Sequence, residues 1–258
     1  MKRDRLAGQV AIVTGGSIGI GWAVARGLAQ CGATVVIVSR TAERVDRAVR
    51  TLNQEVENSS AMGLALDVSR ADDLAEMADR TLERYGRIDS LIAAAGILRP
   101  GDGAIRRLQQ MSVAEWDEVL NVNLKGTFLS NRAVLPTMIQ QRSGQIVNLS
   151  STSGRKGYAF DSAYCASKFG VIGMSQALAE EVRSYGVRVQ VVLPGAIETP
   201  IWHQNGPIPK PENVLPVERL TDLVLYLVGL PPDTVCLETV IEPFGERSSG
   251  FLNKARSR

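Results

Sequence analysis

Tyr164 and Lys168 are the side chains in this 258-residue chain whose types and spacing could do acid–base chemistry. They stand four residues apart in the run Tyr164-Cys-Ala-Ser-Lys168, inside a helical pattern, so both lie on one face of the helix. An ammonium beside a phenol favours the phenolate and lowers the phenol's pKa from its usual value of about 10. We therefore expect a phenol that donates a proton to, or accepts one from, a carbonyl or alcohol oxygen.

The stretch from Thr14 to Gly21 holds four glycines and could hold a phosphate group. It follows the run Gln9-Val-Ala-Ile-Val13 and opens a helical pattern, and its glycines have the spacing G-x-x-x-G-x-G. Glycine permits a tight turn and the close approach of backbone N–H groups, and the N-terminus of a helix favours a pyrophosphate. Taken alone, the loop is also consistent with a plain turn between a strand and a helix.

Arg40 indicates which dinucleotide such a loop would hold. The second apolar run ends at Val38 and is followed by Ser39 and Arg40. In nucleotide-binding folds this position faces the adenosine ribose, where an acidic residue bonds the 2′-hydroxyl. Here a guanidinium, which can pair with a phosphate, replaces the acid. We expect NADP(H) to be preferred, with NAD(H) possible, because Ile18 leaves the loop without a second basic contact; the alternative is a solvated Arg40 that begins a helix.

Further residues stand at intervals that match one known family. Ser151 ends an apolar run and stands 13 residues before Tyr164, and Asn123 lies in the helical pattern that precedes this run. With the glycine loop, they make the sequence resemble the short-chain dehydrogenase/reductase family over essentially the whole chain. The motifs that carry the resemblance are Thr14-Gly-x-x-x-Gly-Ile-Gly21, Asn123, Ser151, Tyr164-x-x-x-Lys168 and Pro194-Gly195 with Thr199.

The resemblance implies a catalytic role for each of four residues. Tyr164 would be the general acid in reduction and the base in oxidation, and Lys168 would lower its pKa and bond the nicotinamide ribose. Ser151 would orient the substrate carbonyl and stabilise the developing alkoxide. Asn123 would hold a water that links Lys168 to solvent. The cofactor would supply the hydride.

The resemblance also implies a set of cofactor contacts and no metal. The glycine loop would hold the phosphates, Asp67 and Val68 would contact the adenine, and Ile197 with Thr199 would close over the carboxamide and phosphates. The cofactor-binding residues that it implies are Gly15, Ser17, Ile18, Gly19, Ile20, Gly21, Ser39, Arg40, Asp67, Val68, Ala94, Ala95, Gly96, Tyr164, Lys168, Pro194, Gly195, Ile197 and Thr199.

Short apolar runs alternate with longer helical patterns along nearly the whole chain. Runs such as Thr34–Val38 are continuously apolar, as expected for strands buried on both faces of a parallel sheet. We predict a single-domain α/β Rossmann fold over 1–258, with a doubly wound, seven-stranded parallel sheet and helices on both faces. The predicted strands are Val10–Val13, Thr34–Val38, Met62–Leu66, Ser90–Ala94, Gly144–Leu149, Arg188–Leu193 and Thr239–Pro243. The predicted helices are Gly19–Gln30, Thr41–Glu57, Arg70–Tyr85, Val113–Gln141, Ser162–Tyr185 and Val217–Leu230.

Two segments depart from the family's usual pattern. The run Ala93-Ala-Ala-Gly96 stands where the family often has Asn-Asn-Ala-Gly, so two amides that tie the central sheet are absent. The usual pair of glycines after the last strand is also missing. The segment that leads to this strand resembles the branch of 3-oxoacyl reductases and NADP-dependent hydroxy-acid dehydrogenases. Asp161 is expected to begin its helix as a cap residue.

The segment 199–217 is expected to choose the substrate. It mixes apolar residues with Lys210 and Glu212, and we expect Trp202 to line an apolar wall and His203, the single histidine, to lie in the loop. A lid of this kind suits a small or medium, partly apolar carbonyl or alcohol compound. A 3-oxoacyl thioester, a hydroxy acid, a sugar and a ketone all remain open.

Composition limits the partners. The net charge of +2 gives no reason to expect a nucleic acid or an anionic membrane surface, and no apolar run approaches a membrane span. The three cysteines, unpaired by count, suit a reducing cytoplasm. Apolar residues on the helix at 113–141, namely Phe128, Leu129, Val134 and Leu135, exceed what one sheet face needs, and we expect a homotetramer or a homodimer.

Two other functions stay open for this sequence. An epimerase or lyase on the same scaffold would still use Tyr164 and Lys168. A regulator that binds NADP(H) without turnover would be expected to have lost Ser151, Tyr164 or Lys168, which this chain retains.

Overall fold

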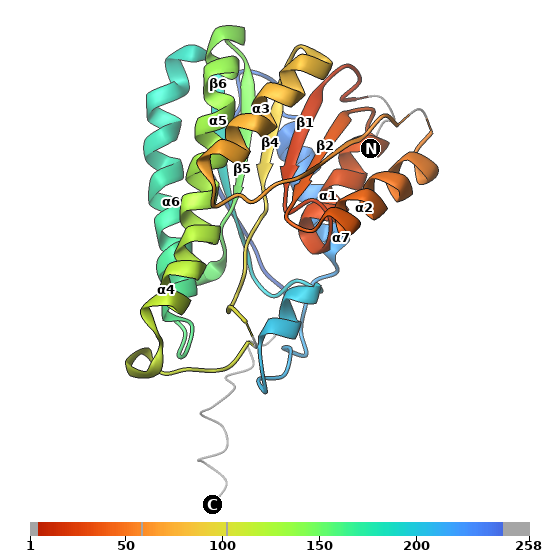
Figure 1. Cartoon of the computed structure of the whole chain (residues 1–258). Coiled ribbons are helices and arrows are strands. Elements are labelled where there is room, and N and C mark those ends of the chain that lie inside the picture. Colours follow the sequence, from red (N-terminus) through yellow and green to blue (C-terminus); the bar gives the residue numbers. More distant parts are fainter. Residues whose placement is uncertain (1–4, 58, 102, 245–258) are drawn as a thin grey trace, which may run out of the picture.

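The computed structural model describes residues 5–57, 59–101 and 103–244, which form one α/β unit built on a parallel sheet (Figure 1). Its seven strands lie in the order β3-β2-β1-β4-β5-β6-β7. The ends of the predicted domain, 1–4 and 245–258, lie outside these residues. The strands are β1 (Val10–Thr14), β2 (Thr34–Ser39), β3 (Met62–Ala65), β4 (Ser90–Ala93), β5 (Gly144–Leu149), β6 (Val187–Pro194) and β7 (Glu238–Ile241).

Helices cover both faces of the sheet. The α1, α2 and α7 side chains pack in one apolar cluster on one face, and those of α3, α5 and α6 pack in another on the opposite face. The α-helices are α1 (Gly19–Gln30), α2 (Ala42–Glu55), α3 (Ala71–Tyr85), α4 (Val113–Leu120), α5 (Gly126–Gln141), α6 (Ser162–Val182) and α7 (Val217–Val228). The shorter helical turns are η1 (Leu108–Gln110), η2 (Asn121–Lys125), η3 (Thr152–Gly154), η4 (Arg183–Tyr185) and η5 (Pro200–Gln204).

The order of strands turns around β1, which pairs with β2 on one side and β4 on the other. In register, Thr14 at the end of β1 lies beside Val38 and beside Ala93. In open α/β sheets, ligands bind outside the carboxyl ends of the strands at this reversal. The strand order therefore places the candidate site at the carboxyl ends of β1 and β4.

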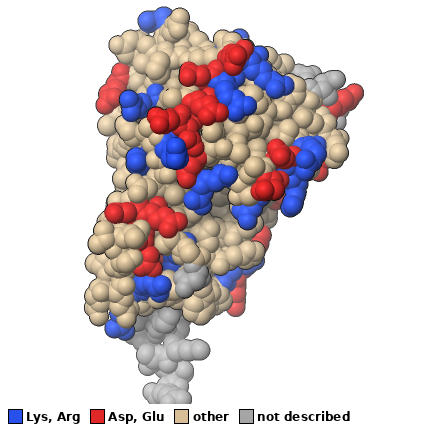
Figure 2. All heavy atoms as spheres, viewed as in Figure 1, with Lys and Arg blue, Asp and Glu red and all other residues tan. Residues whose placement is uncertain are grey.

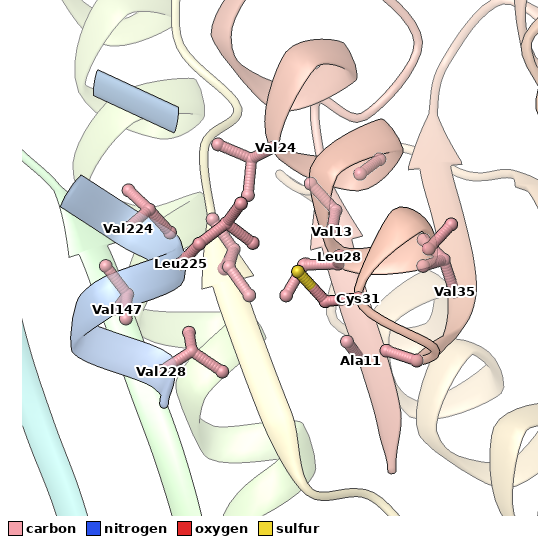
Figure 3. Close-up of a cluster of buried hydrophobic side chains, with 14 of the residues drawn as sticks. Ala11, Val13, Val24, Leu28, Cys31, Val35, Val147, Val224, Leu225 and Val228 are labelled. Atoms are coloured by element: carbon pink, nitrogen blue, oxygen red, sulfur yellow. The ribbon is translucent and has the colours of Figure 1, made fainter. Parts of the chain in front are cut away.

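The core on the α1 face fixes the helix that follows the glycine loop. Val24 and Leu28 of α1 pack in the same apolar cluster as Val224 and Leu225 of α7, on one face of the sheet (Figure 3). Gly27 lets the two helices approach, because a Cβ there would lie 2.9 Å from a methyl of Leu225. The second half of α1 is thereby packed against α7.

The predicted fold class and sheet are confirmed, and the differences are local. The helix predicted over 113–141 contains a π-helical turn, η2, between α4 and α5. Pro200–Gln204 forms a 3₁₀ turn within the stretch expected to be irregular. The apolar surface predicted on α5 is partly wrong, because Leu129 and Val134 are buried in the protein's own core and only Phe128 of the four is exposed.

The missing amides after β4 coincide with an incomplete hydrogen-bond network. Ala93 pairs in register with Asn148 of β5, whose side-chain nitrogen donates to the Ser175 hydroxyl at 3.0 Å. Among the described residues, the Asn148 side-chain oxygen has no hydrogen-bond partner. Buried polar atoms are normally paired, so the Asn148 oxygen is an unsatisfied acceptor in this part of the sheet.

Charges of both signs are interspersed on the face drawn in Figure 2. Such a mixture fits the near-neutral balance of the chain. Among the described helices, none combines the length and the apolar character that a membrane crossing requires.

Candidate active site

Three segments that follow strands, those after β1, β4 and β6, meet at the carboxyl edge of the sheet. A Cβ on Gly15, after β1, would lie 2.8 Å from the backbone nitrogen of Ala95, after β4. A Cβ on Gly19 would lie 3.8 Å from the Cβ of Thr199, after β6. The predicted residues of these loops are therefore brought together, and in Figure 1 the segments after β4 and β6 both extend below the sheet.

The glycine loop has no room for a side chain at Gly15, Gly16 or Gly21. A Cβ on Gly21 would lie only 2.3 Å from the carbonyl oxygen of Gly15, so the first turn of α1 rests directly on the loop backbone. Gly15 and Gly19 have φ angles of +66° and +57°, in the region that favours glycine. Both the close packing and the turn therefore require glycine.

The start of α1 fits an anionic group. Ile18 occupies the N-cap without a side-chain cap, and the first turn contains no acidic residue. The Ser17 hydroxyl is buried and has no partner among the described residues. Free backbone donors, the positive end of the helix dipole and an unpaired hydroxyl are the groups that bind a pyrophosphate. These residues fit the nicotinamide dinucleotide that the sequence predicts.

At the predicted adenine end of the site, the residues differ in whether their side chains already have partners within the protein. Arg40 is exposed, and no hydrogen bond or ion pair of its side chain occurs within the described residues. The Asp67 carboxylate accepts hydrogen bonds from the backbone and the hydroxyl of Ser69 at 2.9 and 2.8 Å. Val68 is buried and packs against Gly126. Arg40 is thus the side chain here that is free to bind a phosphate.

Lys168 is a buried ammonium beside Tyr164. Its Nζ donates to the carbonyl oxygen of Leu149 at 2.9 Å and lies 5.6 Å from the centre of the Tyr164 ring. Burial lowers the pKa of Lys168 to about 8. The amine is therefore mostly protonated at neutral pH and can lose its proton in the alkaline range.

The pKa of Tyr164 moves in the direction opposite to the one predicted. Removal of the hydroxyl from water raises it to about 12, and the nearby charges of Asp161 and Cys165 act in the same direction. A hydrogen bond with Ser151 opposes this rise. The prediction of a lowered pKa is wrong for this structure, because desolvation outweighs the stabilisation of the phenolate. Tyr164 is consequently a neutral phenol, the form that donates a proton.

Ser151 lies directly after β5 and next to Tyr164. Its hydroxyl oxygen accepts a hydrogen bond from the backbone of Ser153 at 3.1 Å, which leaves its proton for Tyr164 or a ligand. The neighbouring Ser150 donates to the carbonyl oxygen of Lys168 at 2.8 Å. This bond fixes the start of α6 to the end of β5, so Ser151, Tyr164 and Lys168 form one group.

Asn123 lies in the π-helical turn η2 and is fully buried. Its amide accepts from the Ile97 backbone nitrogen at 2.8 Å, and donates to the Ile97 carbonyl at 2.9 Å and to the Ser167 hydroxyl at 3.1 Å. The side chain thus ties the segment after β4 to α6. The predicted water-holding role stays a prediction, and it would have to use the main-chain carbonyl of Asn123, which accepts from Thr127.

An ion pair that the sequence did not predict lies next to Tyr164. Arg99, after β4, is buried and pairs with Asp161 at the start of α6. Asp161 occupies the N-cap, as expected, but its side chain makes no cap hydrogen bond, so the predicted capping role is wrong. The pKa of Asp161 is raised by burial, against the effect of Arg99. No local spacing could have indicated a pair whose members lie 62 residues apart.

The lid segment after β6 is attached on both sides. Ile197 is buried, its main chain bridges to Leu215, and its carbonyl oxygen accepts from the Trp202 indole at 2.8 Å. Trp202 is half-buried and His203 is exposed. A pocket beside Tyr164 is lined mainly by apolar side chains, including Leu98. The apolar wall predicted at Trp202 remains a prediction.

Comparison with known proteins places this arrangement in context. A family model described as short chain dehydrogenase matches residues 9–208. A 3-oxoacyl-(acyl-carrier-protein) reductase from Thermotoga maritima is 41% identical over 197 residues, 76% of this chain and 77% of that protein. A D-threitol dehydrogenase from Mycolicibacterium smegmatis is 37% identical over 205 residues, 79% of this chain and 76% of that protein.

A solved structure is similar along almost the whole chain. It is a metagenomic short-chain oxidoreductase in complex with NADP, with a TM-score of 0.80 and 35% identity. The match covers 94% of this chain and 100% of that one. The likeness therefore includes the strands and loops that build the candidate site.

Proposed function

The chain belongs to the short-chain dehydrogenase family and is an oxidoreductase, and we propose that it uses NADP(H) to interconvert a carbonyl compound and a secondary alcohol. The observation that carries this proposal is the group formed by Ser151, Tyr164 and Lys168. It lies at the carboxyl edge of the sheet, the same edge as a glycine loop whose N–H groups and buried Ser17 hydroxyl have the chemistry of a phosphate site.

The proposed chemistry follows from the protonation states of these side chains. NADPH, when bound, supplies a hydride to the carbonyl carbon. Tyr164, a neutral phenol, gives its proton to the carbonyl oxygen as negative charge develops there. The Ser151 hydroxyl donates a hydrogen bond to the same oxygen. The Lys168 ammonium stabilises the phenolate that Tyr164 leaves behind, and at higher pH Lys168 can release its own proton.

The preference for NADP(H) rests on Arg40. An exposed guanidinium without a partner in the described residues can form two parallel hydrogen bonds with a 2′-phosphate. At the other end, Lys168 would bond the nicotinamide ribose, and Gly15, Ser17 and Gly19 would hold the pyrophosphate. The solved relative in complex with NADP supports this choice.

The proposed substrate is a small or medium, partly apolar carbonyl compound. The pocket beside Tyr164 is lined by the apolar side chains of Leu98, Met111, Val119 and Phe160 together with Arg99 and Arg106. The resemblance to a 3-oxoacyl-(acyl-carrier-protein) reductase makes a 3-oxoacyl thioester the first candidate. A polyol is the second, because a D-threitol dehydrogenase is also similar.

We further propose a homotetramer, or a homodimer, in the cytoplasm. Phe128 on α5 and Phe169 on α6 are 45% and 48% exposed, which gives both long helices an apolar surface for a second copy. The free thiols of Cys31, Cys165 and Cys236 suit a reducing compartment. Light scattering at working concentration would contradict the assembly by giving the mass of a monomer.

The proposal is tested with NADPH and NADH against ketones, 3-oxoacyl thioesters, sugars and oxo acids, following the absorbance of the reduced nicotinamide. Turnover with NADPH on one of these classes is the expected result. Bound NADPH without oxidation across the whole panel would contradict the proposal and favour a non-redox enzyme or a regulator.

A further inference from the structure

Arg99 is the described arginine whose side chain is most enclosed, and the proposed chemistry does not use it. It lies in the segment between β4 and η1, and only 7% of the residue is exposed. A buried guanidinium is costly unless its donors are paired. The partners of Arg99 therefore indicate why it is retained inside the protein.

One set of partners lies on the lid. The Arg99 Nη1 donates to the side-chain oxygen of Asn205 at 2.8 Å and to the carbonyl oxygen of Gln204 at 3.3 Å. Next to it, the Leu98 backbone nitrogen donates to the Gln204 side chain at 2.8 Å. The two segments also touch where a Cβ on Gly103 would lie 3.0 Å from the Gln204 carbonyl oxygen. The end of η5 is thus seated on the segment after β4 through Arg99.

The other partner lies at the start of the helix that carries Tyr164. The Arg99 Nη2 forms an ion pair with Asp161, whose carboxyl is mostly buried from solvent. Phe160, just before Asp161, has a φ angle of +70°, a conformation that non-glycine residues rarely adopt and that surrounding contacts must hold. Asp161 is three residues before Tyr164, so its charge acts on the phenol.

We propose that Arg99 is a positioning residue that couples the seating of the first part of the lid, residues 199–208, to the state of Tyr164. One guanidinium holds the lid with Nη1 and neutralises Asp161 with Nη2. When the lid opens, the Arg99 Nη1 loses its hydrogen bonds to Gln204 and Asn205. The ion pair between the Arg99 Nη2 and Asp161 changes at the same time. The coupling of lid to phenol rests on the proposed function, whereas the seating of the lid does not.

Other charged and titratable groups also face the phenol, and the test must separate them. Lys168 and Cys165 lie on the same helix, and Ser151 approaches from the segment after β5. Arg106 and Glu115, which pair at 2.5 Å, line the same pocket from the segment after β4 and from α4. Arg106 therefore provides a matched control for Arg99: it is an arginine of the same segment, but its ion pair is with Glu115 of α4.

The first experiment measures hydrogen exchange of the lid peptide 199–208 in the ligand-free protein. Arg99→Met removes the seating but leaves Asp161 unpaired, so Arg99→Met/Asp161→Asn serves as the version without a buried charge. Both should exchange about tenfold faster in the lid than wild type, because the opening of a segment becomes easier when its contacts are removed. Arg106→Met should not change the lid. Unchanged protection in the double variant would overturn the seating role, whatever reaction the enzyme catalyses.

The second experiment measures the pH dependence of alcohol oxidation, in which Tyr164 must accept a proton. With Arg99→Met, the unpaired Asp161 should raise the pKa of the phenol further, so that kcat on the rising limb, at each pH up to about 9, falls about tenfold; Arg99→Met/Asp161→Asn should restore it. The substrate KM should stay raised in both variants, since neither seats the lid. A residue that only stabilised the fold would change kcat without this restoration in the double variant, and that result would overturn the coupling.

Discussion

Replacing Lys168 with methionine should stabilise the ligand-free protein at neutral pH while it removes turnover. Lys168 is 5% exposed, and this burial lowers the pKa of its ammonium group. A basic group whose pKa is lower in the folded protein than in the unfolded chain binds its proton more tightly when unfolded. Its charged form therefore opposes folding. Methionine has a similar shape and no charge, so it removes this cost.

The magnitude follows from the change in pKa. The pKa of Lys168 falls from 10.5 to about 8, and at about 1.4 kcal/mol per pKa unit this opposes folding by about 3 kcal/mol below pH 8. Loss of the hydrogen bond to Leu149 offsets about 1 kcal/mol of the gain. Lys168→Met should therefore raise the free energy of unfolding by about 2 kcal/mol at pH 7.

The sign of the pH dependence is opposite to that of a salt bridge. Between the folded pKa near 8 and the unfolded value of 10.5, the unfolded chain binds more protons, so wild type gains stability as pH rises. By pH 9.5 wild type should have recovered about 2 kcal/mol, and the advantage of the variant should vanish.

Urea unfolding at pH 7 and pH 9.5 measures both values. Both proteins carry Tyr164→Phe in this comparison, so the phenol beside Lys168 does not contribute to the difference. Lys125→Met, at an exposed lysine in η2, should differ from wild type by the same amount at both pH values. The reasoning is refuted if Lys168→Met is less stable than wild type at pH 7, or if its difference from wild type does not change with pH.

Three further substitutions test other parts of the site. Tyr164→Phe should lower kcat by about a hundredfold or more and retain dinucleotide binding. Tyr158→Phe, at an exposed tyrosine, should leave kcat unchanged. Full activity of Tyr164→Phe in steady-state kinetics would exclude the phenol as the acid. Arg40→Ala should weaken NADPH binding about tenfold or more and NADH binding little, whereas equal losses in titration calorimetry would mean that Arg40 does not bind the 2′-phosphate. Gly21→Ala should displace the glycine loop, because its Cβ would lie 2.3 Å from the Gly15 oxygen, and should lower stability by about 1–3 kcal/mol together with dinucleotide binding. Gly173→Ala, where a Cβ meets nothing within 4 Å, is its control in thermal unfolding, and equal behaviour of the two variants would contradict the close packing.

Local patterns in the sequence were enough for the sheet and for the glycine loop. Continuous apolar runs such as Thr34–Val38 indicate strands covered on both faces, and β2 lies where that run predicts. Gly21 is required by its contact with the Gly15 carbonyl oxygen, so a short stretch contains the signal for that position, whereas Gly15 also meets Ala95 of a distant segment. The spacing of Tyr164 and Lys168 likewise needs only the period of a helix.

The features that the sequence did not predict depend on contacts between distant segments. The π-helical turn that holds Asn123 is stabilised by Ile97, which belongs to another strand end. The pair of Arg99 and Asp161 joins segments 62 residues apart. The pKa of Tyr164 depends on how far its hydroxyl is removed from water, which spacing along a helix does not determine. Burial and long-range pairing were therefore the information that the sequence pattern lacked.

The most direct test of the central claim is the transfer of deuterium to a ketone from NADPH that carries deuterium at both positions of the nicotinamide C4. The account predicts that the alcohol product carries one deuterium on its carbinol carbon for each NADPH consumed by wild type, and that Tyr164→Phe forms this product far more slowly. A product without deuterium, or one formed without consumption of NADPH, would contradict hydride transfer at this site.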